Sequence, residues 1–272
     1  MNTQEILKLS LQLAEFVERP DDTRIYHPCE NVQRILLGID IDEGDLRDAK
    51  KRGYDLVLAH HPPVKVGIEG VLSRHIDLML EAGVPEAQAQ AAFDEHFASL
   101  SSRWSRDEAG PSHDDFSKIA KDLNIGFMNI HLPCDEIGRV ILQETVDALS
   151  ELASVADLMT AFAAIPEIAA AGEGVELVSG TSDSPAGRCL VIHAAGTNGG
   201  YPVATALYEA GYDTVVYIHL HEEQAERLRA EAQGNLITTG HYGSDSLGIN
   251  PLVHRLREAG IQVDLCNKMV PR

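Results

Sequence analysis

Short apolar runs alternate with helical segments along most of this chain. Each run has the length of a strand, and most are rich in the branched apolar residues of buried strands. The runs cover residues 34–40, 55–59, 125–130, 189–194, 213–218, 235–239 and 261–266. Strands that alternate with helices form βαβ units, in which neighbouring strands run parallel. We therefore expect an α/β fold with mostly parallel sheets.

Helical periodicity is typical of the segments between these runs. The expected helices cover residues 42–52, 72–123, 138–171, 202–210 and 222–233, with a last helix that ends at Gly260. A polar break is expected at 107–112, and Pro166 is a candidate interruption of a helix. The polar segment 180–187 is a candidate domain boundary.

One stretch of sequence recurs later in the chain. Gly53–His61 reads GYDLVLAHH, and Gly211–His219 reads GYDTVVYIH. In both stretches a glycine that ends a helix is followed by Tyr-Asp, an apolar strand and a histidine. Two related α/β halves would explain the repeat, and so would chance similarity between two helix-turn-strand units.

The charge balance argues against some classes of partner. The chain has 22 Lys+Arg and 42 Asp+Glu, which give a formal net charge of −20. Nucleic acids and anionic membranes are bound by clustered basic residues, so we expect neither partner. No apolar run approaches the ~18 residues of a membrane span, and the N-terminus lacks the basic start of a signal peptide. The four cysteines lie far apart, as in a cytoplasmic protein with reduced thiols.

The positions of the twelve histidines are the strongest indication of function in this sequence. Several of them directly follow expected strands, and ligands of open α/β sheets bind at the carboxyl ends of strands. These strand-end residues are His60, His61, His131, His219 and His241. The remaining histidines without a partner pattern are expected on the surface, and these are His27, His75, His96, His113 and His254.

Two strand-end histidines are followed by an aspartate at the fourth position. His131 and Asp135 form one pair, and His241 and Asp245 form the other. In a helix or tight turn, each pair faces the same way. Imidazoles combined with carboxylates suit borderline divalent ions such as zinc, iron or manganese, and a set of this size suits a two-metal site. An alternative for Asp245 is that it only caps a helix.

Other motifs leave alternatives open. The turn at residues 195–200 follows a strand and precedes a helix, so it either cradles a phosphate or is a plain βα turn. His219 and His221 either contribute to a metal site or are exposed residues at a strand end. Cys134 is expected to pack beside the site rather than to act as a nucleophile.

Three motifs together resemble those of the NGG-one-interacting-factor-three family, whose bacterial members are often named GTP cyclohydrolase 1 type 2 homologues. They are His60-His61-Pro62, His131-Leu-Pro-Cys-Asp135 and Gly240-His241-Tyr-Gly-Ser-Asp245. The resemblance extends to the flanking strands and covers most of the chain. It implies two interlinked α/β domains with a dinuclear metal site in the cleft between them, and a homohexamer. Residues 1–140 with 235–272 are then expected to form the first domain, and 141–234 the second.

The resemblance also implies a ligand set. It assigns the metal ligands to His60, His61, Asp135, His241 and Asp245. It places His131 close to the metals, where we expect a catalytic acid/base or a residue that supports the ligands. The family usually has Glu where this chain has Asp245, and many members have a Thr-Gly-Glu type of turn where this chain has His219 and His221.

These observations favour a protein that binds two divalent ions of zinc, iron or manganese. We expect a metal-dependent hydrolase that acts on a small phosphorylated or nucleotide-like substrate. The alternative is a metal-binding scaffold, or a regulatory or metal-trafficking protein, without turnover. An open coordination position favours catalysis, and a saturated ligand shell favours the scaffold.

Overall fold

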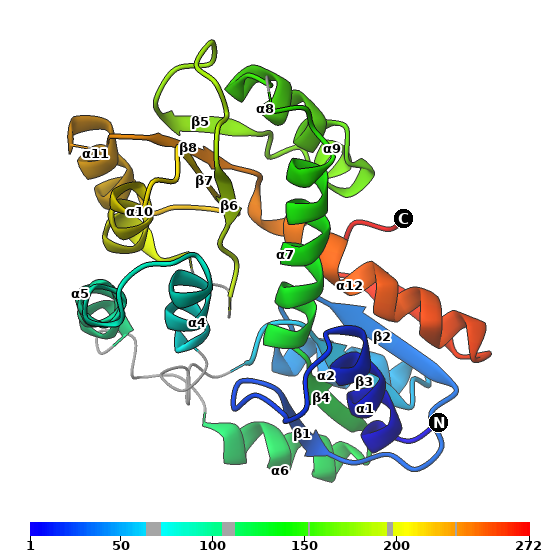
Figure 1. Ribbon diagram of the computed structural model, residues 1–272. Helices are drawn as coiled ribbons and strands as arrows, with labels where there is room; N and C mark the ends of the chain where they lie inside the picture. The colour runs from blue at the N-terminus through cyan, green and yellow to red at the C-terminus, as the bar shows by residue number, and fades with distance from the viewer. Residues whose placement is uncertain (64–71, 105–111, 152, 195–197, 232) are drawn as a thin grey trace. The chain divides into compact units, whose positions relative to one another are not determined.

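The computed structural model describes residues 1–63, 72–104, 112–151, 153–194, 198–231 and 233–272 (Figure 1). The chain forms two compact units. The first unit contains Met1–Val71, Glu108–Gly138 and Asp245–Arg272, and the second contains Leu72–Asp107 and Arg139–Ser244. Helices α7 (Leu132–Asp147) and α12 (His241–Glu258) contribute residues to both units.

The first unit is built on a five-stranded sheet with the order β1-β4-β3-β2-β9. Its strands are β1 (Arg24–His27), β2 (Arg34–Gly38), β3 (Leu56–Ala59), β4 (Gly126–Asn129) and β9 (Gln262–Cys266). All neighbours are parallel except β1, which runs antiparallel to β4. The helices that lie wholly in this unit are α1 (Thr3–Leu13), α2 (Glu43–Lys51) and α6 (His113–Leu123).

Both faces of this sheet are covered, as its continuous apolar strands require. Successive side chains of a strand point to opposite faces. Leu36 and Val57 therefore join the core formed with α2 and α6. Their neighbours Leu37 and Leu58 point to the opposite face, where they lie near Ile249 of α12.

The second unit is built on a four-stranded sheet with the order β5-β8-β7-β6. Its strands are β5 (Glu176–Ser179), β6 (Cys189–Val191), β7 (Thr214–Tyr217) and β8 (Asn235–Thr238). Its helices are α4 (Arg74–Glu81), α5 (Glu86–Trp104), α8 (Val155–Ala163), α9 (Pro166–Ala171), α10 (Gly200–Glu209) and α11 (Glu222–Glu231). Helix α10 packs against α4, α5 and α11.

Four strands of the first sheet share the topology of the second sheet, which has no counterpart of β9 among the described residues. Each has an antiparallel edge strand, β1 or β5, beside three parallel strands in the order β4-β3-β2 or β8-β7-β6. The repeated sequence forms β3 in one sheet and β7 in the other, at the same place in the strand order. This agreement favours two related halves over chance similarity.

The strand and helix pattern confirms the expected α/β class with mostly parallel sheets. The sequence did not indicate β1 and β5, which are short edge strands with mixed polar and apolar residues. Pro166 begins α9. The segment 180–187 connects β5 and β6 inside the second unit, and residues 72–107, expected in the first domain, also belong to the second unit.

The expectation that His75 and His96 lie on the surface is wrong. Their exposed fractions are 0% and 4%, and their ring centroids lie 5.6 Å apart. They lie on α4 and α5, which pack against each other and against α10. Helical periodicity alone did not show that both faces of this pair are covered. In the described part of the chain, none of the helices has the length and apolarity that a membrane crossing requires.

Candidate metal centre

Parallel strand ends bring the first two motifs together. His60 and His61 directly follow β3, and His131 follows β4 by two residues. Ala59 and Asn129, the last residues of these strands, are paired in register. The segments that leave the two strands therefore begin side by side at the carboxyl edge of the sheet.

Each His-x-x-x-Asp pair begins a helix, as the spacing predicts. The carbonyl of His131 accepts hydrogen bonds from the amides of Cys134 (2.8 Å) and Asp135 (3.1 Å), so α7 starts directly after it. Helix α12 begins at His241 and carries Asp245 one turn further on. Asp245 is 1% exposed inside this helix, so the alternative that it only caps the helix is wrong.

Gly248 allows α7 and α12 to approach each other closely near Asp135 and Asp245. A Cβ atom on Gly248 of α12 would collide with the carbonyl oxygen of Cys134 on α7. It would also lie 3.0 Å from the amide nitrogen of Gly138. The missing side chain lets the two backbones touch, and this contact lies next to Asp135 and Asp245 in the sequence.

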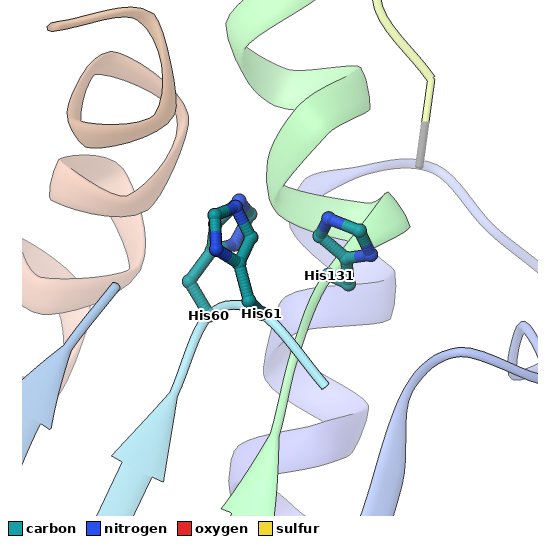
Figure 2. A group of neighbouring side chains, drawn as sticks. All are labelled: His60, His61 and His131. Atoms are coloured by element: carbon teal, nitrogen blue, oxygen red, sulfur yellow. The ribbon is translucent and has the colours of Figure 1, made fainter. Parts of the chain in front are cut away.

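Three imidazoles gather at this edge of the first unit. Figure 2 shows His60 and His61 after β3 and His131 where the chain enters α7. The ring centroid of His60 lies 5.0 Å from that of His61 and 4.9 Å from that of His131. The rings of His61 and His131 lie 5.3 Å apart.

Hydrogen bonds fix which nitrogen of His60 and His61 faces the aspartates. Nδ1 of His60 lies 3.0 Å from the carbonyl oxygen of Ile130, which can only accept, so Nδ1 carries the proton. Nδ1 of His61 donates in the same way to Asp40 at 2.7 Å. Both Nε2 atoms then face carboxylates and are the nitrogens that a metal would bind.

The Nε2 atoms converge on Asp135 and Asp245. Nε2 of His60 lies 3.2 Å from Oδ1 of Asp135 and 3.8 Å from Oδ1 of Asp245. Nε2 of His61 lies 3.4 Å from Oδ2 of Asp245. Asp245 therefore faces both histidines with different oxygens, which is the arrangement a bridging carboxylate requires.

Asp22 contacts the ring of His131 at the nitrogen that faces away from Asp135. Nδ1 of His131 lies 2.8 Å from Oδ2 of Asp22, and its Nε2 lies 3.8 Å from Oδ2 of Asp135. The side chain of Asp22 is fully buried. The hydroxyl of Thr23 accepts from the amide of His131 at 3.1 Å, so backbone and ring are both positioned.

The carboxylates dominate the electrostatics of the cluster. Burial disfavours the charged form of His60, but Asp245 and Asp135 outweigh burial and raise the pKa of His60 well above 6.5. The pKa of His61 is also raised, because Asp245 and Asp40 outweigh burial. Two buried carboxylates need a compensating positive charge, and a divalent cation would supply it in place of protons.

The donor atoms fit a metal ion. In one group the ligand atoms of His60, His61 and His131 all lie within 4.8 Å of one another. In a second group the same holds for His60, Asp135 and Asp245. Imidazole nitrogens with carboxylate oxygens are the ligands that zinc, iron and manganese take in proteins. These two groups of the first unit, which contain four of the expected ligands with His131 beside them, could therefore hold a metal.

The fifth expected ligand, His241, belongs to the second unit. Its ring centroid lies 4.5 Å from that of His219, and it stacks on Tyr242 at 5.1 Å. Glu173 accepts hydrogen bonds from the amides of Tyr242 (2.7 Å) and Gly243 (3.3 Å). A carboxylate thus stabilises the helix start that holds His241.

Sequence reasoning missed Asp22 and Asp40. Neither has a spacing that relates it to its histidine, since each pair is made by the tertiary fold. Asp40 could have been suspected, because it follows β2 at the same sheet edge. Cys134 is 1% exposed, and burial raises the pKa of its thiol even though His60 opposes this, so a neutral thiol packs beside the centre as expected.

The expected phosphate-binding turn lies partly outside the described residues. In the described part, Asn198 accepts from the amide of Ile218 at 2.8 Å. Gln224 accepts from the amide of Tyr201 at 2.9 Å, which occupies one donor of the first turn of α10. These bonds agree with the interpretation of a structural βα turn.

A family model described as Duf34/NIF3 (NGG1p interacting factor 3) matches residues 24–269. A NIF3 superfamily protein from Sphaerobacter thermophilus is 39% identical, with a TM-score of 0.90, and the match covers 99% of each chain. A comparison with curated proteins found no match.

More distant structures share the fold. Reduced HcgD from Methanocaldococcus jannaschii is 13% identical with a TM-score of 0.59, and the match covers 97% of each chain. TTHA1606 from Thermus thermophilus is also 13% identical, with a TM-score of 0.53 and 97% of each chain covered.

Proposed function

The chain belongs to the Duf34/NIF3 family, and on this basis we propose that it is a dinuclear metal-binding protein that hydrolyses a small phosphorylated or nucleotide-like substrate. The observation that carries the proposal is the convergence of Nε2 of His60 and Nε2 of His61 on Asp135 and Asp245. We propose these residues as ligands together with His241, which lies one helical turn before Asp245.

Bound divalent ions would supply Lewis acidity and a hydroxide at neutral pH. Side chains of the protein would carry out the proton transfer. Nε2 of His131 faces the ligand cluster, where it can act as a general acid or base. The carboxylate of Asp22 lies 2.8 Å from Nδ1 and positions the ring with Nε2 toward the cluster. Asp40 orients His61 in the same manner.

The second candidate is a metal-holding or metal-trafficking protein without turnover. Burial favours it, since the side chains of His60, Asp135 and Asp245 are 1% exposed or less. The side chain of His61 is 20% exposed, which leaves one ligand for contact with a substrate. The two candidates share the metal centre and differ in whether a coordination position is open.

Turnover tests decide between the two candidates. We expect phosphoester hydrolysis that is abolished by a chelator and restored by metal. The variant His131→Gln should keep its metal content and lose activity, whereas Asp135→Asn should lose metal. Full metal content with no hydrolysis across phosphoester and nucleotide substrates would contradict the enzyme and support the scaffold.

We also infer from family membership that the protein is a homohexamer that acts on a small molecule. Light scattering coupled to gel filtration measures the mass directly. A mass of about six chains of 29.6 kDa is expected, and a monomer would contradict this inference.

A further inference from the structure

The loop between β7 and α11 carries two histidines that the proposed centre does not use. These are His219 and His221, and the ring of His219 lies 4.5 Å from that of His241. The rings of His219 and His221 lie 6.3 Å apart. His241 and His219 are partly buried, and His221 is exposed. The three imidazoles therefore form a row that begins at α12 with His241 and ends at the surface of the second unit with His221.

The repeated topology gives His219 a counterpart among the proposed ligands. His219 follows β7 by two residues, as His61 follows β3. His241 follows β8, the neighbour of β7, as His131 follows β4, the neighbour of β3. The pair in the second unit is thus equivalent to the pair His61 and His131, whose rings lie 5.3 Å apart.

The surroundings of His219 and His241 favour imidazole ligands. Both line a cavity of about 200 Å³ in the second unit, together with Glu173, Glu222 and Arg229. Glu173 binds amides at the start of α12, and Arg229 pairs with Glu222 at 2.6 Å. Glu173, Glu222 and Arg229 are committed to these contacts, and Glu176 also lines the cavity. Imidazoles are good ligands for borderline divalent ions, whereas they bind magnesium and calcium poorly.

We propose that His219 and His241 form an accessory site, with the exposed His221 at its entrance, that captures a divalent transition-metal ion and passes it to the proposed centre at Asp245. The delivery step rests on the proposed metal centre, but the capture site does not. With fewer protein ligands than the proposed centre, the accessory site binds its ion more weakly, which is what a site of passage requires. The exposed His221 makes the first contact, and the partly buried His219 hands the ion to its neighbour His241.

Loading kinetics test the delivery step. Metal-free protein is mixed with limiting Zn²⁺, and uptake is followed with a chromophoric chelator. His219→Ala/His221→Ala should load about tenfold more slowly and reach the same final metal content. His254→Ala is the matched control, because it removes an exposed imidazole that pairs with Glu258 on α12. Equal loading rates in wild type, control and double variant would overturn the delivery step.

A titration tests the capture site without the proposed centre. His60→Ala/His61→Ala should still bind one Zn²⁺ per chain weakly in calorimetry, and adding His219→Ala/His221→Ala should abolish this binding. No binding in the His60→Ala/His61→Ala background would overturn the capture site. If wild type and this background bind the same single weak ion, the proposed centre is wrong and the accessory site stands. Thermal melting confirms folding, and glutamine replaces alanine in any variant that unfolds.

Discussion

Replacing Gly248 by alanine should loosen the metal centre without touching a ligand. The added Cβ would lie 2.9 Å from the carbonyl carbon of Cys134. Ordinary carbon contacts begin at about 3.5 Å, so α7 and α12 must separate by at least roughly 0.6 Å, and the collision with the carbonyl oxygen demands more. Asp135 and Asp245 lie next to this contact on the two helices. A shift of this size exceeds the ~0.5 Å within which a functional constellation must be held.

Two quantities should change in Gly248→Ala. Metal affinity should fall by about 10- to 100-fold, as when residues that orient ligands are lost. Overpacking should lower the free energy of unfolding by about 1–3 kcal/mol. Competition with a chelator measures the affinity, and denaturant unfolding of the metal-free protein measures the stability.

Gly44→Ala is the matched control for this variant. Gly44 lies in α2, where a Cβ would meet only the side chain of Asp42, with its oxygen at 3.0 Å. This control should keep the wild-type metal affinity. Wild-type metal affinity in Gly248→Ala, or an equal loss of affinity in Gly44→Ala, would contradict this role of Gly248.

Three further predictions concern single side chains. Asp40→Asn should lower metal affinity about tenfold in chelator competition, because His61 loses the carboxylate that orients it; unchanged affinity would count against that role. Asp22→Asn should lower kcat about 100-fold or more at unchanged metal content, since the neutral amide no longer places a negative charge 2.8 Å from Nδ1 of His131; a normal kcat would contradict it. Burial raises the pKa of Cys189 to about 12, so alkylation at about pH 8 should be slow and rise about tenfold per pH unit, as mass spectrometry would show; fast, pH-independent labelling would disagree.

The sequence predicted those parts of the fold that depend on local patterns. Apolar runs indicated the parallel strands, and His-x-x-x-Asp spacing indicated that His131 and Asp135 face the same way. The edge strands β1 and β5 were missed because four mixed residues give no periodicity. Their place is set by pairing with β4 and β8, which is a tertiary property.

In the site, too, residues placed by local patterns could be predicted from the sequence, and residues placed by tertiary contacts could not. Ligands that follow strands could be found by position, because parallel strands end at one edge of the sheet. Asp22 could not, since it reaches His131 only after β1 has paired with β4. The burial of His75 and His96 likewise follows from helix packing and not from their spacing.

Metal content per chain tests the central claim most directly. Wild type and His60→Ala/His61→Ala are purified without chelators, desalted, and analysed by elemental mass spectrometry. We expect about two zinc, iron or manganese ions per wild-type chain and their loss in the variant. Wild-type protein that binds no metal even after reconstitution, or a variant that keeps the full content, would contradict it.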